Sequence, residues 1–495
     1  MKFCSGPKSA GIGGEFRGSA KTRSVPISGA SALAKPPVKS SPAPAASAGP
    51  GTACQPNTAT RLRPLERVPG SARRSRQQGG LRRVIRRVIR YALLASLALL
   101  PDGSAVRGAA FVPADDHTVL ERIRTPAGAP VARELRAWRA RLAQDPANLR
   151  LAVEVAQAFL SHARAEADPR GLGYAQAALA PWWNLSTAPA PVLVLRATIR
   201  QSNHEFTPAL ADLDHALQLN PADAQAWLTR ATILQVLGRY DEARRACLPL
   251  ARLASALVAT TCASAIASLS GQADQSYAAL RRAVARDDAA SVPEKSWALT
   301  VLAEIAERCG MRSEAEDHFR AALALSPRDP YLLGAYADLL LDQQRGLEAI
   351  TWLRAATHVD ALLLRLCLAE QSSPRSAGFG QHLAALRERF AANRNRGNKV
   401  HQREEARFEL HLRGHPAEAL RLARENWAVQ REPADARVLL EAAIAARAWG
   451  TVAEVEEWLR AVKLEDVRLT TLLAQSRSAK PNPVPVLKEV NEVAR

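Results

Sequence analysis

From residue 146 onward, apolar and small residues recur at the three-to-four-residue spacing of helix faces, and the pattern itself repeats along the chain. The segment AWLTRATILQVLGRYDEA (226–243) shows one unit, in which Gly238 separates two helical stretches. A period of roughly 34 residues predicts one helical hairpin per repeat, which buries its apolar face only when neighbouring repeats stack on it. Other segments align with the last alanine of this unit, and the aligned positions are Ala209, Ala243, Ser276, Ala315 and Ala349.

Small residues also recur within the first helix of each unit. Glycine stands at three of the predicted turns, where it can adopt a left-handed conformation without a side-chain clash. The aromatic residue that follows, Phe206 or Tyr240, is placed to fill the wedge between the two helices. The small residues of the first helices are Ala197, Ala231, Ser264, Ala303 and Ala337, and the turn glycines are Gly238, Gly271 and Gly310.

Helix starts are indicated by capping residues. Asp145-Pro146, Asn220-Pro221 and Asp329-Pro330 each place a capping side chain before a proline at the predicted first helical position. Ser291 and Glu294 have the spacing of a capping box. The one longer interval of the repeat, from Ser276 to Ala315, is therefore interpreted as a loop insertion in front of that helix.

These residues resemble the tetratricopeptide repeat. The segment 226–243 carries family residue types at Trp227, Ala231, Gly238, Tyr240 and Ala243, whereas Arg230, Leu250, Ser276 and His204 depart from the family pattern. The resemblance is strongest over residues 190–361. It implies an all-α fold, a right-handed α-solenoid of stacked helix–turn–helix repeats, whose first helices line a concave binding surface.

The predicted organisation has seven parts. Glycines at 414 and 450 are expected at the turns of the late repeats, and the stripe Val131, Leu135, Trp138 and Leu142 predicts the capping helix. The parts are a disordered basic Ser/Pro/Ala-rich leader (1–80), a signal-peptide-like segment (81–110), an N-terminal linker and capping helix (111–145), repeats (146–370), an irregular basic insertion with a short helix (371–402), degenerate repeats (403–475) and a flexible tail (476–495).

The net charge of +19 lies mostly in the leader. Residues 1–90 hold 18 of the 67 basic residues and 2 of the 48 acidic ones, so they carry +16 and the rest of the chain carries +3. Bulk charge therefore predicts no nucleic-acid binding by the folded array.

Residues 81–110 have the order of a signal peptide: five arginines, the uncharged stretch 91–100, Pro101 and then small residues. The stretch is shorter than the roughly 20 apolar residues of a membrane span. We expect an exported bacterial protein, periplasmic or membrane-anchored facing the periplasm, that meets the membrane only through this segment. The 80 residues in front of this segment are unusual for a signal peptide. Translation could begin at residue 81 or 84, the segment could belong to a transit peptide, or it could be a helix with a basic flank in a cytoplasmic protein.

Four cysteines lie outside the leader, at Cys247, Cys262, Cys309 and Cys367, and they permit three complete pairings. An exported chain could oxidise Cys247 with Cys262, which fall on successive predicted helices. Small buried thiols within the helix packing are the alternative.

No phosphate-binding loop, nucleophile elbow or zinc motif occurs in the sequence, so we expect no enzyme activity, cofactor or metal. His411 and His415 are four residues apart, but a turn is expected to separate them. The sequence predicts a non-catalytic scaffold that binds a peptide or protein segment in a concave groove. The alternative is an intracellular regulatory protein whose basic leader contacts nucleic acid or an acidic partner. Groove residues are expected on the exposed face of the first helices, at Thr232, Gln235, Glu304, Arg308, Asp338 and Asp342.

Overall fold

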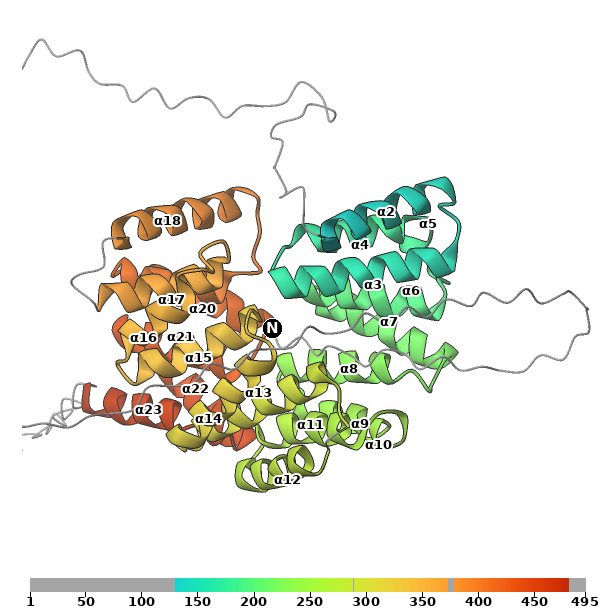
Figure 1. Cartoon of the computed structure of the whole chain (residues 1–495). Helices are drawn as coiled ribbons and strands as arrows, with labels where there is room; N and C mark the ends of the chain where they lie inside the picture. Colours follow the sequence, from blue (N-terminus) through green and yellow to red (C-terminus); the bar gives the residue numbers. More distant parts are fainter. Residues whose placement is uncertain (1–129, 288, 373–377, 480–495) are drawn as a thin grey trace, which may run out of the picture. The chain divides into compact units, whose positions relative to one another are not determined.

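The computed structural model describes residues 130–479 apart from 288 and 373–377, and the described chain is built of helices without strands (Figure 1). The predicted disordered leader, the predicted signal peptide and residues 480–495 of the predicted tail lie outside the described residues. Consecutive helices pair as α3 (Leu149–Glu166) with α4 (Arg170–Ala178), α6 (Ala190–Ser202) with α7 (Phe206–Leu219), α8 (Ala224–Val236) with α9 (Tyr240–Cys247), α11 (Ala256–Ala267) with α12 (Ala273–Arg286), α13 (Val292–Arg308) with α14 (Arg312–Leu325), α15 (Pro330–Asp342) with α16 (Gly346–Leu353), α17 (Asp360–Gln371) with α18 (Phe379–Asn395), α19 (Gln402–Arg407) with α20 (Pro416–Val429), and α21 (Pro433–Ala445) with α22 (Trp449–Val462).

The remaining elements are short or terminal. Helix α2 (Pro130–Gln144) precedes the first pair, and α23 (Val467–Ala479) follows the last one. Helices α5 (Ala180–Trp183) and α10 (Leu250–Leu253) are single turns, and a π-helix, η1 (Phe408–Leu412), continues α19. The predicted all-α solenoid is therefore confirmed.

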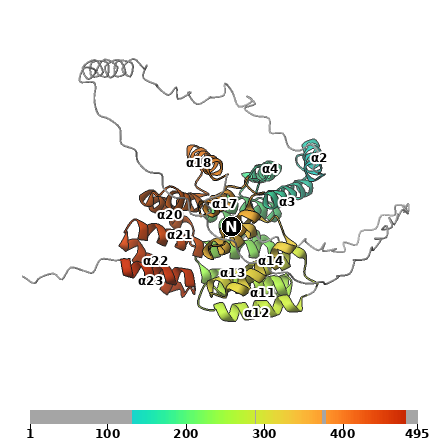
Figure 2. The same ribbon diagram turned by 60° about the vertical axis from the view of Figure 1, so that its left-hand side comes forward.

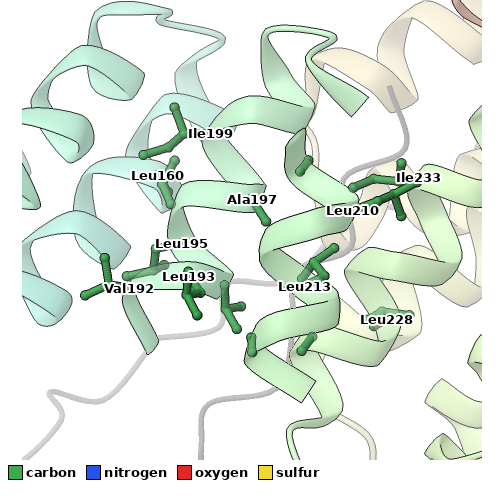
Figure 3. Packing of buried hydrophobic residues seen from close by; sticks show 14 of the residues in the cluster. Leu160, Val192, Leu193, Leu195, Ala197, Ile199, Leu210, Leu213, Leu228 and Ile233 are labelled. Carbon is green, nitrogen blue, oxygen red and sulfur yellow. The ribbon is translucent and has the colours of Figure 1, made fainter. Parts of the chain in front are cut away.

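Small residues let the two helices of each pair approach closely. Those predicted for the first helices are nearly inaccessible, from 0% exposure at Ala197 to 4% at Ser264, and Ala209, Ala243, Ala315 and Ala349 on the second helices are at 0%. Larger side chains from adjoining repeats then fill the space between pairs. Figure 3 shows Leu160, Ile199 and Leu213, from α3, α6 and α7, within one such cluster. Each pair thus depends on its neighbours for burial.

Apart from the turn between α17 and α18, which is only partly described, each turn between paired helices contains one residue with a left-handed backbone. Glycine holds this position at Gly238, Gly271 and Gly310, with φ between 72° and 79°, as the sequence predicted, and Gly414 does so at 68°. Non-glycine residues hold it elsewhere: Ala167 at 49°, His204 at 61°, Gln344 at 60° and Arg447 at 56°. The expected turn at Gly450 was wrong, because Gly450 lies in α22 and Arg447 makes the turn.

Two predicted helix starts were also wrong. Asp145 and Asn220 each open a four-residue turn closed by a backbone hydrogen bond from Asn148 or Asp223, 3.2 Å in both cases. Asn148 and Asp223 are the capping residues of α3 and α8. Proline also suits the second position of a β-turn, and Pro146 and Pro221 occupy that position in these two turns.

The other two starts were correct. Asp329 caps α15 with Pro330 as the first helical residue, and Ser291 and Glu294 form the capping box of α13.

The segment predicted as an irregular insertion is more regular than expected. Helix α18 covers 17 residues and buries Leu386 and Phe390 completely. The Phe390 ring lies 5.2 Å from that of Phe408, so α18 packs onto the next repeat. The predicted tail boundary at 476 falls inside α23, which extends to Ala479.

A disulfide joins Cys247 at the end of α9 to Cys262 in α11, with their Cα atoms 6.0 Å apart. Both residues are buried. Helix α9 ends early, shortly before Pro249, and the disulfide ties this shortened helix to the following repeat. The pairing considered from the sequence is the one in the structure, whereas Cys309 and Cys367 are free thiols.

Breaking this disulfide is expected to destabilise the protein by about 3 kcal/mol, because it closes a loop of 15 residues in the unfolded chain. The measurement is urea unfolding of Cys262→Ser against Cys309→Ser, which removes a free thiol and is the control. Peptide mapping without reductant must recover Cys247 linked to Cys262. Equal unfolding midpoints for the two variants would contradict the prediction.

Arg447→Gly is expected to raise the free energy of unfolding by about 1 kcal/mol, because glycine adopts the left-handed conformation without the clash of a Cβ atom. Ala446→Gly is the matched control, since Ala446 has φ of −83° and gains nothing from glycine. Thermal unfolding of both variants tests this, and a stabilised Ala446→Gly with an unchanged Arg447→Gly would refute the assignment of the turn.

Candidate protein-interaction site

The six predicted groove residues lie on three first helices, α8, α13 and α15, but they are not an open face. Gln235, Glu304 and Arg308 are buried at 6%, 8% and 4% exposure, so their expected exposure was wrong. Thr232 is half-buried and donates a hydrogen bond to the Leu228 carbonyl. Asp338 and Asp342 retain 20% and 25% side-chain exposure and are engaged in ion pairs.

Asp338 pairs with Arg365 of α17, and the other partners of these acids come from the last part of the described chain. We define the C-terminal arm as α19 to α23, residues 402–479, and the acidic face as Glu307 of α13 with Asp338 and Asp342 of α15. The arm supplies at least one arginine to each acid, and Arg468 also lies 3.9 Å from Asp342. The pairs are Arg407 with Asp338 at 3.1 Å, Arg437 with Asp342 at 2.6 Å and Arg468 with Glu307 at 2.7 Å. Three first-helix carboxylates therefore bind three guanidinium groups from distant repeats.

Asp338 is ion-paired with arginines from two helices, α17 and α19. Burial alone would raise its pKa, but Arg365 at 2.6 Å and Arg407 outweigh burial and hold the pKa of Asp338 well below its usual range. The carboxylate thus stays ionised over the physiological range, and it links α17 and α19 to α15.

Glu307 behaves in the opposite way. Burial raises its pKa to about 7, although Arg468 lies 2.7 Å away. The negative charges of Asp342, Asp338 and Asp466 also favour the protonated form. Reasoning from the sequence missed Glu307, which lies next to the predicted Arg308, because its partner is 161 residues away along the chain.

The arm also contacts the turns of the central repeats. The Arg431 amide donates to the Val236 carbonyl at 2.7 Å, and the Tyr240 hydroxyl donates to the Arg431 carbonyl at 3.4 Å. A Cβ atom added at Gly238 would lie 3.4 Å from the Cβ of Arg431. The first residues of α9 are therefore held against the loop between α20 and α21.

The last part of the arm contacts two further turns. A Cβ added at Gly271 would lie 3.2 Å from the Cβ of Lys463, and one at Gly310 would lie 3.4 Å from Val467. The Ala273 amide, at the start of α12, donates to Glu465 at 3.0 Å. Figure 2 shows α22 and α23 beside α11 and α13, in agreement with these contacts.

The arm has a hydrophobic core of its own. Leu439, Val455 and Leu469 belong to a cluster confined to residues 406–473. Partly buried side chains of the arm, Trp458, Val462 and Leu464, pack against the separate cluster that contains α8 and α9. At its start the arm also buries Phe408 in the cluster of the preceding repeats, so the seam combines apolar contacts with a row of ion pairs.

The other sequence candidates have ordinary structural roles. His411 pairs with Glu441 at 3.0 Å and His415 with Glu409 at 2.8 Å, so the two imidazoles do not converge. Within residues 130–479, as far as they are described, no group of three or more potential metal ligands occurs. In the same part of the chain, no helix has the length and apolar character needed to cross a membrane.

Two of the basic residues of α18 are engaged in ion pairs. Arg389 pairs with Asp360 at 3.1 Å, and Arg394 pairs with Glu405. These arginines tie α18 to α17 and to the arm.

The described chain is an α-solenoid of helical hairpins whose late repeats dock on earlier ones. Residues 213–245, from α7 to α9, match the model of the tetratricopeptide repeat, in agreement with the repeat type inferred from the sequence. No curated protein is significantly similar to this chain in sequence.

Several solved structures resemble the chain at low sequence identity. A chain of the APC/C hetero-tetramer Cut9–Hcn1 is 14% identical, with 63% of this chain and 52% of that chain covered and a TM-score of 0.36. A tetratricopeptide repeat protein from Parabacteroides merdae is 13% identical, with coverages of 59% and 97% and a TM-score of 0.31. The human IFIT1 dimer with m7Gppp-AAAA is 11% identical, with coverages of 70% and 86% and a TM-score of 0.39. This chain thus spans about half the length of the first of them.

The raised pKa of Glu307 predicts a pH-dependent stability. Between about pH 4.5 and pH 7 the folded state binds more protons at this site than the unfolded state, so the contribution of Glu307 is full below pH 4.5 and is lost as the pH rises through 7. When the pH is raised from about 5 to about 8, the free energy of unfolding of Glu307→Gln should increase by about 1 to 3 kcal/mol relative to that of the native chain. Each pKa unit corresponds to about 1.4 kcal/mol.

Urea unfolding at the two pH values measures this difference. Glu314→Gln, on an exposed position of α14, is the control and should follow the native chain at both. A Glu307→Gln variant that also follows the native chain at both would contradict the raised pKa.

Proposed function

We propose that this chain is a non-catalytic scaffold that binds a segment of another protein on the first-helix face of its repeats. The observation that carries the proposal is the match of residues 213–245 to the tetratricopeptide repeat, together with the continuation of the same hairpin on both sides. Stacked hairpins offer an extended surface of first helices, which suits a polypeptide better than a small ligand. Thr232 and Asp342, which retain solvent contact, mark the accessible part of this surface.

We further propose that the protein is exported. The signal-peptide-like order of residues 81–110 supports export, and the disulfide between Cys247 and Cys262 suits an oxidising compartment. An intracellular protein with a basic leader is the competing outcome.

Export is tested by N-terminal sequencing of the protein purified from its native host. A mature chain that begins near residue 106 or 111 is expected. A chain that retains residues 1–80 in the cytoplasm would overturn export and leave the basic leader as a functional segment.

Binding is tested with the full-length protein as bait against a random peptide phage library. Enriched peptides are expected to lose affinity about tenfold or more when Asp342 is changed to alanine, because truncation of a central interface residue costs about 1.4 kcal/mol or more. Glu314→Ala, on a second helix away from this face, is the control and should bind as the native chain does. No enrichment, or equal loss in both variants, would refute a first-helix binding site.

A further inference from the structure

We propose that the C-terminal arm is an intramolecular occupant of a guanidinium-selective surface, and that it competes there with an arginine-bearing segment of a partner protein. This inference rests on the proposed scaffold function and specifies the chemistry of the partner. The surface is the acidic face of Glu307, Asp338 and Asp342.

First, the arm pairs with the acidic face through arginine side chains. Each of the three acids takes a guanidinium group, and no lysine is paired with any of them among the described residues. Asp342 accepts two hydrogen bonds from Arg437, at 2.6 and 2.7 Å, and Asp338 likewise accepts two from Arg407, at 3.1 and 3.4 Å. Paired bonds of this kind need the planar fork of arginine, which an ammonium group cannot reproduce.

Second, solvent reaches these ion pairs. The side chains of Arg437 and Asp342 are 26% and 25% exposed, and those of Arg468 and Glu307 are 24% and 10% exposed. Ion pairs that water reaches contribute little net stability and are open to exchange with another cation. At Asp342 the acidic face can therefore change partners without leaving a deeply buried charge unpaired, whereas Glu307 is the more buried of the two acids.

Third, the arm has a hydrophobic core of its own. Because Leu439, Val455 and Leu469 are buried within the arm, it keeps its own packing when the seam opens. The loop between α18 and α19 contains Gly397, with φ of 66° and open space around it. Against the cluster that contains α8 and α9 the apolar contacts of the arm are only partly buried, whereas Phe408 is buried against Phe390 of α18 and holds the start of the arm in place. Seams of mixed polarity between packed units permit relative motion, so the later part of the arm can open while its start stays docked.

The experiment first measures opening by hydrogen exchange. Arg437→Asp should speed exchange at least tenfold in the turns that the arm covers, at residues 236–240, 270–274 and 308–312, and leave α3 unchanged. The charge-swapped pair Asp342→Arg with Arg437→Asp should restore protection. Should Arg437→Asp fail to fold, Asp342→Asn removes the same ion pair from the other side.

The matched control is Arg424→Asp, which makes the same charge change at an exposed pair within the arm, between α20 and α22. It should leave exchange in the three turns as in the native chain. Unchanged exchange in both Arg437→Asp and Asp342→Asn would overturn the proposal.

Binding is then measured with two fluorescent peptides of equal charge, one of alternating Arg and Gly and one of alternating Lys and Gly. Arg437→Asp should bind the arginine peptide at least tenfold more tightly than the native chain or Arg424→Asp does, and more tightly than it binds the lysine peptide. Equal affinity for the two peptides, or an equal gain in Arg424→Asp, overturns the guanidinium selectivity. Enrichment of arginine-poor peptides from the phage library would also overturn the guanidinium selectivity, but it would still support the scaffold function.

Discussion

The close contact of two helices at small residues is the constraint on which the rest of this structure depends. Ala231 and Ala243, both inaccessible to solvent, let α8 and α9 approach until larger side chains from the next pair close over them. A hairpin of this kind has an apolar surface on both sides, so it is stable only within a stack. The ends of the stack must therefore be covered, and α2 does this at one end by burying Leu135 and Leu142.

The periodicity that reveals this contact is local, and local features are what the sequence predicts well. The repeat period, the turn glycines and the capping box at Ser291 all follow from residues within one unit. Errors arose where one residue type serves two local structures. Proline after Asn220 suits a helix start or a β-turn, and the capping residue Asp223 three positions later resolves the choice. Arg447 in a left-handed turn carries no signal, because the surrounding packing and not its own preference sets its backbone.

The acidic face was beyond local reasoning for a different reason. Helical spacing identifies which side of α15 carries Asp338 and Asp342, but it does not say what covers that side. Their partners in the arm are 69 and 95 residues away, across several repeats whose stacking angles no single repeat encodes. The prediction of an inner surface on the first helices was useful, while the prediction of its exposure failed at Gln235, Glu304 and Arg308.

Contacts between distant repeats change how such an array responds to stress. In a linear stack the stability is a sum of repeat and nearest-neighbour contributions, so damage at one repeat stays local. Here α9 begins at Tyr240, which contacts the Arg431 carbonyl, and ends at Cys247, which is bonded to α11. The disulfide and the arm therefore constrain the same eight-residue helix from its two ends. We therefore expect loss of the disulfide to weaken the contact of Tyr240 with the loop around Arg431, because one helix joins the two constraints.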